Sequence, residues 1–533
     1  MSLNRSSGFS SSRLDKKRPL RIALVNLASE RDNWEIMMVP LGLQYLAAVL
    51  KERFGEAVEV LIGDMGLIPR QTPLDQVARA YLSDVRPDVV GLRGFSNQAE
   101  MYHVVAKEAK RARPDALVIA GGPHAATLSQ GLFADENIDL VVPLEGEETL
   151  PEVISRWIDG GAVHEVAGVT WSEKGEKRFA PARPLIEDLD ALPFPDYSDI
   201  DLDAYQQFKT MTGLRPKGKA TSLFTTRGCF FRCTYCHDHF GKRVRKRSLD
   251  NVIAEMEWLI THKGVTEFQI IDDIFNADRP RAIELFDRIQ KLGWKIHLAF
   301  PNGLRGDMLT EEFIAAAKEA GAYHWALAIE SASPRIQKLV KKHNKLDRLM
   351  RAIELSDRYG IFTSTFTMFG FPTETREEMQ MTADYLLASQ AHSALMFQVQ
   401  PYEGTEIRDQ VSQLTSGVME GELTFSPAPG NPDAWFTEVP QVEMRALILD
   451  TMRQFHFTEA RLRRVLELTE TCHAKPALAE YMHFTMSECG LTLREMPNSP
   501  VRRMLADLFR HEGPVPYERW QPPFIPEIHA LPV

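Results

Sequence analysis

Three cysteines set close together are the residues of this chain best suited to chemistry. The chain has five cysteines, and three of them lie within eight residues: Cys229, Cys233 and Cys236. The other two lie more than two hundred residues further on. Isolated buried cysteines would not cluster in this way, and a set of three cannot close into disulfides by itself. The spacing therefore predicts a bound metal.

Two kinds of metal centre are open at this point. Zinc would need a fourth ligand, which His237 or His239 could supply. An iron–sulfur cluster can use three thiolates and leave one iron open for an outside ligand. The C-x3-C-x2-C spacing differs from the C-x2-C pairs of zinc ribbons and favours the cluster.

The residues from Ser222 onward predict the elements that position this loop, because short apolar runs alternate there with helical stretches. Strands are predicted at 222–226, 268–271, 295–300, 324–329, 362–369 and 394–399, and helices at 249–261, 281–292, 311–320, 345–359 and 377–389. Six β/α units are too few for a closed eight-stranded barrel. We therefore expect a partial (β/α)6 barrel with its active site at the carboxyl ends of the strands.

Polar residues and a glycine follow the predicted strands at those ends, as the cysteine run follows the first strand. They are Asp272, Asp273, Asn302, Glu330, Ser331, Gly370 and Gln400. Asp272 and Asp273 could instead cap the next helix. Glu330 follows an apolar run and should meet a polar partner, because burying an acid alone is costly. We also predict that Thr373 caps the helix that begins after Gly370.

The first part of the chain alternates in the same way. Strands are predicted at 22–27, 58–62, 89–92, 117–120 and 140–142, and helices at 40–53, 74–85, 98–112, 125–133 and 147–157. This alternation predicts an α/β fold with a doubly wound, Rossmann-like parallel sheet, which binds ligands outside the carboxyl ends of its strands. The loops at those ends are 26–33, 91–96, 121–124 and 145–148. Their glycines would let the backbone approach a large flat ligand, although each loop could simply turn the chain.

Two sets of motifs resemble one known family. The cysteine run, with the aromatic Tyr235 before its last cysteine, resembles the radical S-adenosylmethionine (SAM) signature. The runs Pro40-Leu41-Gly42-Leu43, Gly121-Gly122-Pro123-His124 and Gly146-Glu147 resemble, in position and order, the cobalamin-binding domain in front of many such enzymes. The chain therefore resembles a cobalamin-binding radical SAM enzyme over roughly residues 20–410.

The resemblance implies cofactors and their sites. A [4Fe-4S] cluster would be held by the three cysteines and would bind SAM through its open iron. The implied SAM residues are Asp272, Asp273, Asn302, Glu330, Ser331, Gly370 and Gln400, with the acids after the second strand suited to the SAM ammonium. The implied cobalamin residues are Gly94, Ser96, Gly121, Gly122, His124, Gly146 and Glu147. Residues 26–31 lack the D-x-H-x-x-G run, so we expect no protein histidine on the cobalt, and His124 could be a structural histidine.

Composition and the positions of glycine and proline residues suggest five segments. We expect a disordered tail at 1–19, a cobalamin-binding-like domain at 20–158, a linker at 159–215, a radical SAM barrel at 216–410 and a mainly helical, substrate-covering region at 411–533. The net charge of −11 argues against a general nucleic-acid binder, and no apolar run approaches the length of a membrane span. Few cysteines and an oxygen-sensitive cluster indicate a reducing cytoplasm.

The resemblance implies methylation of an unactivated carbon, or of phosphorus, in a small-molecule metabolite. An electron donor such as flavodoxin or ferredoxin would reduce the cluster. One alternative is a relative that does not transfer methyl groups, such as the anaerobic cyclase of bacteriochlorophyll synthesis. An alternative of another class is a zinc-bound scaffold without catalysis.

Overall fold

The structure is a computed structural model that describes residues 18–28, 38–67, 72–210, 213–237, 239–414, 437–468 and 471–511. The described chain forms two compact units, which meet in sequence between Ile200 and Asp201. Residues 1–17 of the predicted tail and 29–33 of the first predicted loop lie outside the described residues, as does the Pro-rich end from 512 onward. No helix of the described residues is both long enough and apolar enough to cross a membrane.

The first unit is built on one seven-stranded sheet. Its strands are β1 (Leu20–Asn26), β2 (Val58–Asp64), β3 (Val89–Arg93), β4 (Leu117–Gly121), β5 (Leu140–Val141), β6 (Thr170–Glu173) and β7 (Glu176–Phe179). They lie in the order β2-β1-β3-β4-β5-β6-β7, and the first five are parallel. The hairpin β6–β7 comes from the predicted linker and adds antiparallel strands to the edge.

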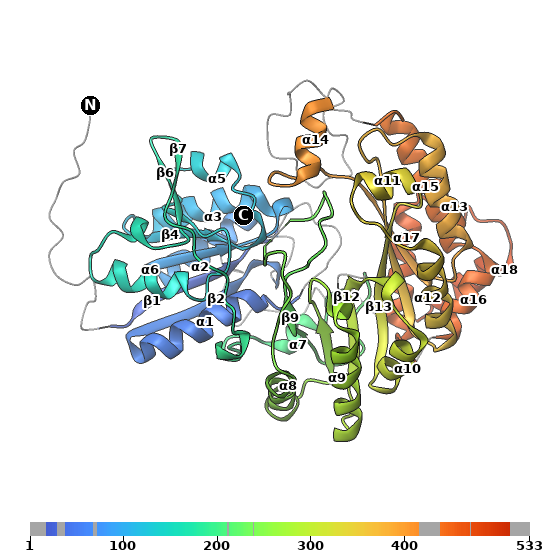
Figure 1. The fold of residues 1–533 in the computed structure, drawn as a ribbon, viewed down its shortest axis with the longest axis horizontal. Helices are drawn as coiled ribbons and strands as arrows, with labels where there is room; N and C mark the ends of the chain where they lie inside the picture. The colour runs from blue at the N-terminus through green and yellow to red at the C-terminus, as the bar shows by residue number, and fades with distance from the viewer. Residues whose placement is uncertain are drawn as a thin grey trace. The chain divides into compact units, whose positions relative to one another are not determined.

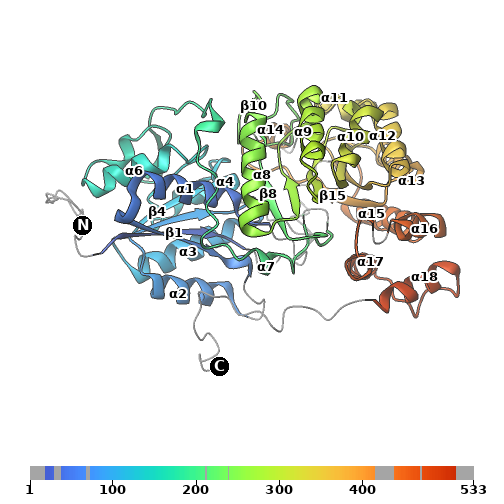
Figure 2. The same cartoon turned by 90° about the horizontal axis from the view of Figure 1, so that it is seen from below.

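Helices cover both faces of this sheet. They are α1 (Leu41–Phe54), α2 (Leu74–Val85), α3 (Ala99–Ala112), α4 (Gly122–Ala125), α5 (Gln130–Ala134) and α6 (Thr149–Ile158). Along β1, Ile22 and Leu24 join the core under α1 and α6, while Ala23 and Val25 join the core under α2 and α3. This alternation follows from the period of two in a strand, and Figure 2 shows the two helix layers. The predicted doubly wound sheet is confirmed.

The helix predicted at 125–133 is wrong in one respect. The chain forms two short helices there, α4 and α5, with a break between them. Ser129 accepts a hydrogen bond from the backbone N–H of Gly131 and so begins α5 as its N-cap. A serine that competes for backbone hydrogen bonds favours such a helix start over a helix interior.

The second unit contains an open barrel. Its strands are β8 (Ala220–Leu223), β11 (Glu267–Ile270), β12 (His297–Leu304), β13 (Ala322–Glu330), β14 (Phe362–Phe369) and β15 (Ser393–Gln398). All neighbours are parallel in the order β15-β14-β13-β12-β11-β8. The helices between them are α8 (Leu249–Lys263), α9 (Arg279–Leu292), α10 (Glu311–Glu319), α11 (Pro334–Leu339), α12 (Leu346–Arg358) and α13 (Arg376–Ala388). Figure 1 shows α9, α10 and α12 beside β12 and β13, so the predicted partial barrel is confirmed.

Two strand ends differ from their prediction. β12 was expected to end at Phe300 but continues to Leu304, with a shift of register between Phe300 and Leu304. Pro301 has no N–H for the ladder, which is why a strand end is predicted there, and the irregular register accommodates it. β13 includes Glu330, which has a φ of +63° at a further register shift. Asn302 and Glu330 therefore lie within the ends of their strands.

Three of the C-terminal helices pack at the opposite end of the barrel from the cysteines. The C-terminal elements are α14 (Glu406–Leu414), α15 (Gln441–His456), α16 (Glu459–Glu467), α17 (Lys475–Glu488) and α18 (Pro500–Phe509). Residues of α16, α17 and α18 share a core with Ala299, Tyr323 and Phe362, which lie near the amino ends of β12, β13 and β14. These three helices therefore cover the base of the barrel. A substrate-covering role stays a prediction for the segment that carries α14 and α15.

Candidate active site

The cysteine loop begins where the first strand of the barrel ends. Gly228 has a φ of +92°, and a Cβ there would lie 2.3 Å from the carbonyl oxygen of Arg243. Glycine suits this position because it has no Cβ to clash with the neighbouring backbone. Two short strands, β9 (Thr226–Arg227) and β10 (Arg245–Lys246), pair antiparallel across the root of the loop. The cysteines thus lie in a closed loop beyond the carboxyl end of β8.

The three thiols have the chemistry that an iron–sulfur cluster requires. Cys233 is buried, Cys229 is half-buried and Cys236 is exposed. The hydrogen bond with Cys236 and the nearby ammonium of Lys342 lower the pKa of the Cys233 thiol to about 6. Burial raises the pKa of the Cys229 thiol, and the same hydrogen bond raises that of the Cys236 thiol, so only Cys233 is held toward the thiolate form that binds iron. Three thiols in one closed loop, one of them with a lowered pKa, fit the cluster that the spacing predicts.

The geometry gives no support to the zinc alternative. His237 Nε2 lies 3.1 Å from the carbonyl oxygen of Glu403, and its ring stacks on that of His239. In the part of the chain that the structure describes, no three His, Cys, Asp or Glu side chains are placed to hold a single metal ion. Zinc needs such convergence. A cluster does not, because each cysteine binds a different iron.

Glu330 has the polar partners that its burial requires. Its Oε1 accepts hydrogen bonds from the Tyr235 hydroxyl and from Lys342 Nζ, both at 3.1 Å. The side chains of Glu330 and Lys342 are only 8% and 12% exposed. Burial lowers the pKa of Lys342, but Glu330 and the thiols of Cys233 and Cys236 outweigh it and raise that pKa overall. The ammonium therefore stays charged beside the cysteine loop.

The two acids after β11 contact the root of the cysteine loop. Asp272 is buried, and it accepts hydrogen bonds from the backbone N–H of Thr225 at 2.6 Å and from the hydroxyls of Thr225 and Thr226 at 2.6 and 2.8 Å. Burial raises the pKa of its carboxyl group. Asp273 accepts a hydrogen bond from the N–H of Gly228 at 2.8 Å. Neither acid is the N-cap of the next α-helix, which is Asp278.

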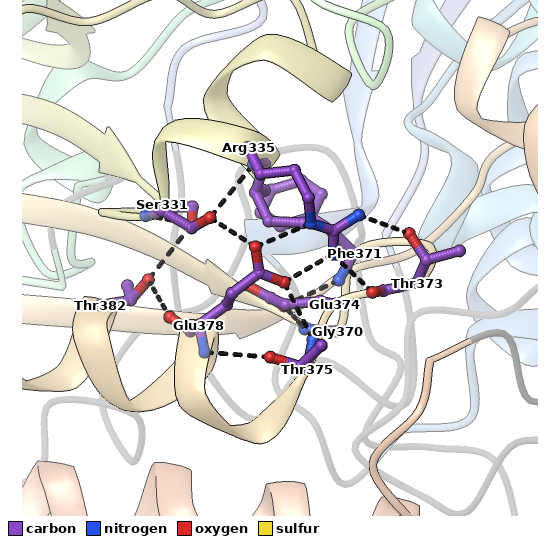
Figure 3. A network of polar contacts seen from close by, with 11 residues as sticks. Ser331, Arg335, Gly370, Phe371, Thr373, Glu374, Thr375, Glu378 and Thr382 are labelled. Atoms are coloured by element: carbon purple, nitrogen blue, oxygen red, sulfur yellow. Dashed lines mark hydrogen bonds and ion pairs between the residues drawn. The ribbon is translucent and has the colours of Figure 1, made fainter.

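A buried acid closes the turn after β14. Oε2 of Glu374 accepts hydrogen bonds from the N–H groups of Gly370 and Phe371 at 2.7 and 3.0 Å, as Figure 3 shows. Burial raises the pKa of Glu374 to about 7. The predicted cap at Thr373 is wrong. Thr375 is the N-cap of α13 instead, because Thr373 lies inside the turn with a φ of +60°.

A second group of contacts ties this turn to the end of β13. Arg335 donates to both carboxylate oxygens of Glu378 and to the hydroxyl and carbonyl oxygens of Thr373 (Figure 3). Ser331 shares a hydrogen bond with the Thr382 hydroxyl at 3.2 Å. Burial opposes ionisation of Glu378, but the hydrogen bond from Arg335 helps to lower its pKa to about 2. This ionic contact holds the loops after β13 and β14 together.

The structure places the predicted SAM residues unequally. Asp272, Asp273 and Glu330 contact the cysteine loop directly, whereas Asn302 donates to the carbonyl oxygens of Asp272 and Ile271. Gly370 and Ser331 belong to the contacts of Figure 3. Gln400 accepts from the N–H of Tyr402 through its backbone oxygen. Their roles toward SAM stay predictions.

Sequence reasoning missed Lys342, Arg335 and Glu378. Lys342 stands in a Lys-Lys pair that reads as an exposed charge, and only the fold buries it. Arg335 and Glu378 lie 43 residues apart, and nothing in either local sequence indicates the partner. The quoted run after Gly370 did contain Glu374, but its burial could not be read from the run.

In the first unit, one tyrosine joins two of the predicted glycine loops. The Tyr102 hydroxyl accepts from the N–H of Gly94 at 2.7 Å and donates to the carbonyl oxygen of Gly121 at 2.6 Å, and it lies 3.1 Å from the carbonyl oxygen of Gly94. His124 is buried, and its ring Nδ1 lies 3.3 Å from the Ser96 hydroxyl. The backbone N–H of His124 donates to the carbonyl oxygen of Gly94. These contacts bring the loops after β3 and β4 together.

The glycines of these loops lie where larger residues would clash. Gly122 has a φ of +81°, and a Cβ there would lie 2.8 Å from Arg93 Cγ. A Cβ at Gly146 would lie 3.1 Å from Leu46 Cδ2, and the neighbouring Glu147 is buried. The glycines therefore let these loops pack closely against Arg93 and Leu46 at the carboxyl ends of the strands.

The same sheet edge exposes large apolar side chains. Phe95 and Leu144 are each 46% exposed, and both lie on the loops that carry the glycines. In place of a D-x-H-x-x-G run, Asn26 donates to Asp64 at 3.0 Å and accepts from Arg93 at 2.9 Å. An apolar, glycine-lined edge fits the face of a corrin, so the residues present fit cobalamin.

Comparisons with known proteins match both units. The model of the B12 binding domain matches residues 34–154, and that of the radical SAM superfamily matches residues 223–386. An uncharacterized methyltransferase of Pyrococcus horikoshii is 30% identical over 69% of this chain and 77% of its own length. The cytidylyl-2-hydroxyethylphosphonate methyltransferase of Streptomyces wedmorensis is 32% identical with the same coverage.

The fold is also that of a solved structure. The radical SAM methyltransferase TsrM of Kitasatospora setae, with cobalamin and a [4Fe-4S] cluster bound, has a TM-score of 0.65 at 16% identity and covers 92% of this chain and 99% of its own. The anaerobic magnesium-protoporphyrin IX monomethyl ester cyclase of Rubrivivax gelatinosus is more distant, at 27% identity over 66% of this chain. The cyclase alternative is therefore less favoured than the methyltransferases.

Proposed function

We propose that this chain, which belongs to the radical SAM enzymes that carry a B12-binding domain, is a methyltransferase. Its target is an unactivated carbon, or less often phosphorus, of a small-molecule metabolite. One observation carries the proposal: a three-cysteine site on a barrel and a glycine-lined site on a doubly wound sheet occur in one chain. A radical reaction alone needs no corrin, and a corrin methylase that acts on a nucleophile needs no radical.

The cofactors of the enzyme are a [4Fe-4S] cluster, SAM and cobalamin. When bound, they supply hydrogen-atom abstraction and methyl delivery, which no side chain can perform. In this chain Cys229, Cys233 and Cys236 would hold the cluster. The loops joined by Tyr102 would hold the corrin.

The described side chains would orient these groups and exclude water. The Glu330–Lys342 pair places one negative and one positive charge beside the cysteine loop. These charges are complementary to the ammonium and the carboxylate of SAM. Tyr235, in the cysteine loop, packs against apolar side chains from other parts of the barrel: Ile336, Val340, Phe371, Val399 and Ile407. A dry wall of this kind strengthens the electrostatic contacts at the site and protects a reactive species from water.

The partners follow from the same chemistry. The substrate is a small molecule, and we propose no nucleic-acid substrate, because the chain carries a net charge of −11. A one-electron donor such as flavodoxin or ferredoxin would reduce the cluster. Because such a cluster is oxygen-sensitive, we propose a reducing, cytoplasmic location.

Isotopic labelling tests the proposal. The reconstituted enzyme is incubated anaerobically with a reductant, methyl-labelled SAM and fractionated metabolite extract. We expect label in a small-molecule product, with S-adenosylhomocysteine and 5′-deoxyadenosine formed in a ratio near one. The matched control is the variant in which all three cysteines at 229, 233 and 236 are alanine, which should form no 5′-deoxyadenosine. Formation of 5′-deoxyadenosine without labelled product or S-adenosylhomocysteine would identify a radical oxidoreductase instead.

A further inference from the structure

The carboxylate of Asp272 accepts three hydrogen bonds from the segment that leads into the cysteine loop. Oδ1 accepts from the N–H of Thr225 at 2.6 Å, and Oδ2 accepts from the hydroxyls of Thr225 and Thr226 at 2.6 and 2.8 Å. The residue is 2% exposed. Each hydroxyl has one proton to donate, and both protons go to this carboxylate. A ligand ammonium that bound Asp272 would have to reach a buried carboxylate and share it with three hydrogen bonds that the protein already makes.

The second acid holds the residue next to the first cysteine. Oδ2 of Asp273 accepts from the N–H of Gly228 at 2.8 Å, one residue before Cys229. Gly228 also has no room for a side chain, because a Cβ there would lie 2.3 Å from the carbonyl oxygen of Arg243 and 2.9 Å from that of Phe240. The end of β11 therefore sets where the cysteine loop starts.

A further layer fixes both partners of this contact. Asn302, in β12, donates to the carbonyl oxygen of Asp272 at 2.9 Å. Arg281 donates to the carbonyl oxygen of Thr225 at 3.3 Å, and Arg247 donates to that of Phe224 at 2.8 Å. Supporting contacts of this kind hold a functional loop in one geometry.

We infer that Asp272 is a positioning residue, which acts with Asp273 to place the cysteine loop, and that it does not bind the ammonium of SAM. The inference rests on the proposed function, because it assumes a cluster on the three cysteines. Its consequence is that β11 and β12 set the position of the cluster against the strand ends. A displacement of about 1 Å at a reacting centre can cost about 100-fold in rate, so such a contact matters to the reaction without touching SAM.

The threonines provide the test, because they share the contact with Asp272. The variants are Asp272→Asn, Thr226→Val, Thr226→Ser and the double variant Asp272→Asn/Thr226→Val, each reconstituted anaerobically as the full chain. The control is Asp250→Asn, on the exposed surface of α8, where the side chain is 90% exposed. Three quantities are measured: iron per chain, the electron paramagnetic resonance spectrum of the reduced cluster without SAM, and the dissociation constant for SAM of the cluster-loaded protein.

We expect Asp272→Asn and Thr226→Val to change the SAM-free spectrum in the same way and to lower iron retention, with the double variant no worse than the single ones. Thr226→Ser, which keeps the hydroxyl, should restore the wild-type spectrum. The dissociation constant for SAM should change less than about threefold, whereas loss of a direct charged hydrogen bond would raise it about 10- to 100-fold.

The opposite pattern overturns the inference. If Asp272→Asn weakens SAM binding tenfold or more while its SAM-free spectrum and Thr226→Val stay like wild type, Asp272 is a SAM ligand. Wild-type behaviour of every variant would also overturn it. Failure of the proposed methyl transfer would leave the SAM-free spectra unaffected, so the two failures are distinguishable.

Discussion

Replacement of Lys342 by methionine tests the electrostatics of the site. Lys342 Nζ lies 3.1 Å from Glu330 Oε1, and both side chains are almost buried. Methionine keeps most of the apolar stem and removes the charge. Glu330 would then keep only the hydroxyl of Tyr235, at 3.1 Å, as the partner of that oxygen. A buried carboxylate would stand beside the cysteine thiolates without its cation.

The expected cost follows from the burial of the pair. Loss of one partner of a buried ion pair typically destabilises a protein by about 3–5 kcal/mol. The remaining hydroxyl contact places Lys342→Met near the lower end, about 3 kcal/mol. The neighbouring Lys341 is a matched control, because its Nζ pairs with Glu406 at 2.7 Å while both side chains are about half exposed. Lys341→Met should cost less than about 1 kcal/mol.

Anaerobic urea denaturation of the cluster-free chain at pH 7 measures both costs. The double variant Lys342→Met/Glu330→Gln removes both charges, and we expect it to recover most of the loss. In the loaded protein, removal of the cation should lower the reduction potential of the cluster, because the added electron loses a favourable charge. Equal costs for Lys342→Met and Lys341→Met would refute the reasoning.

Four further outcomes are expected. Cys233→Ala should lower iron from about four per chain to background in an iron assay. Tyr102→Phe removes the hydroxyl that joins two glycine loops, so it should cost about 1–3 kcal/mol in unfolding and reduce the corrin absorbance of the loaded protein. Tyr359→Phe removes a half-buried hydroxyl with a long contact of 3.4 Å to Glu311 and should do neither. Burial raises the pKa of Glu374 from 4.5 to about 7. Its contribution to stability is therefore greatest below pH 4.5 and is lost as pH rises through 7. Glu374→Gln should remove this decline in urea titrations between pH 5 and 8. Burial lowers the pKa of His473 from 6.5 to about 3. Its contribution to the free energy of unfolding is therefore complete above pH 6.5 and falls toward pH 3 by about 1.4 kcal/mol per pH unit. His473→Gln should flatten this fall in urea titrations at acid pH, and an unchanged slope would contradict the role given to His473.

The sequence by itself determined the chemistry and the order of the units. The cysteine spacing indicated a cluster, because ligand spacing within one loop is a local property. Alternating periodicity predicted both parallel sheets, and the strand predicted at 362–369 has the observed bounds of β14. Burial of apolar faces is repeated at a regular interval along the chain, so it can be read from the chain.

Only the tertiary structure decided what each charged residue of the site contacts. The partners of Asp272 could not be read from its own run, because its carboxylate accepts from Thr225 and Thr226, which lie 46 or more residues earlier. Lys342 became a buried partner of Glu330 because the loop after α11 folds back onto the end of β13. The energy of such contacts depends on distance and burial, and both are set by segments far apart in the sequence. The sequence therefore indicates which residue types surround the cluster, and the fold decides which of them face one another.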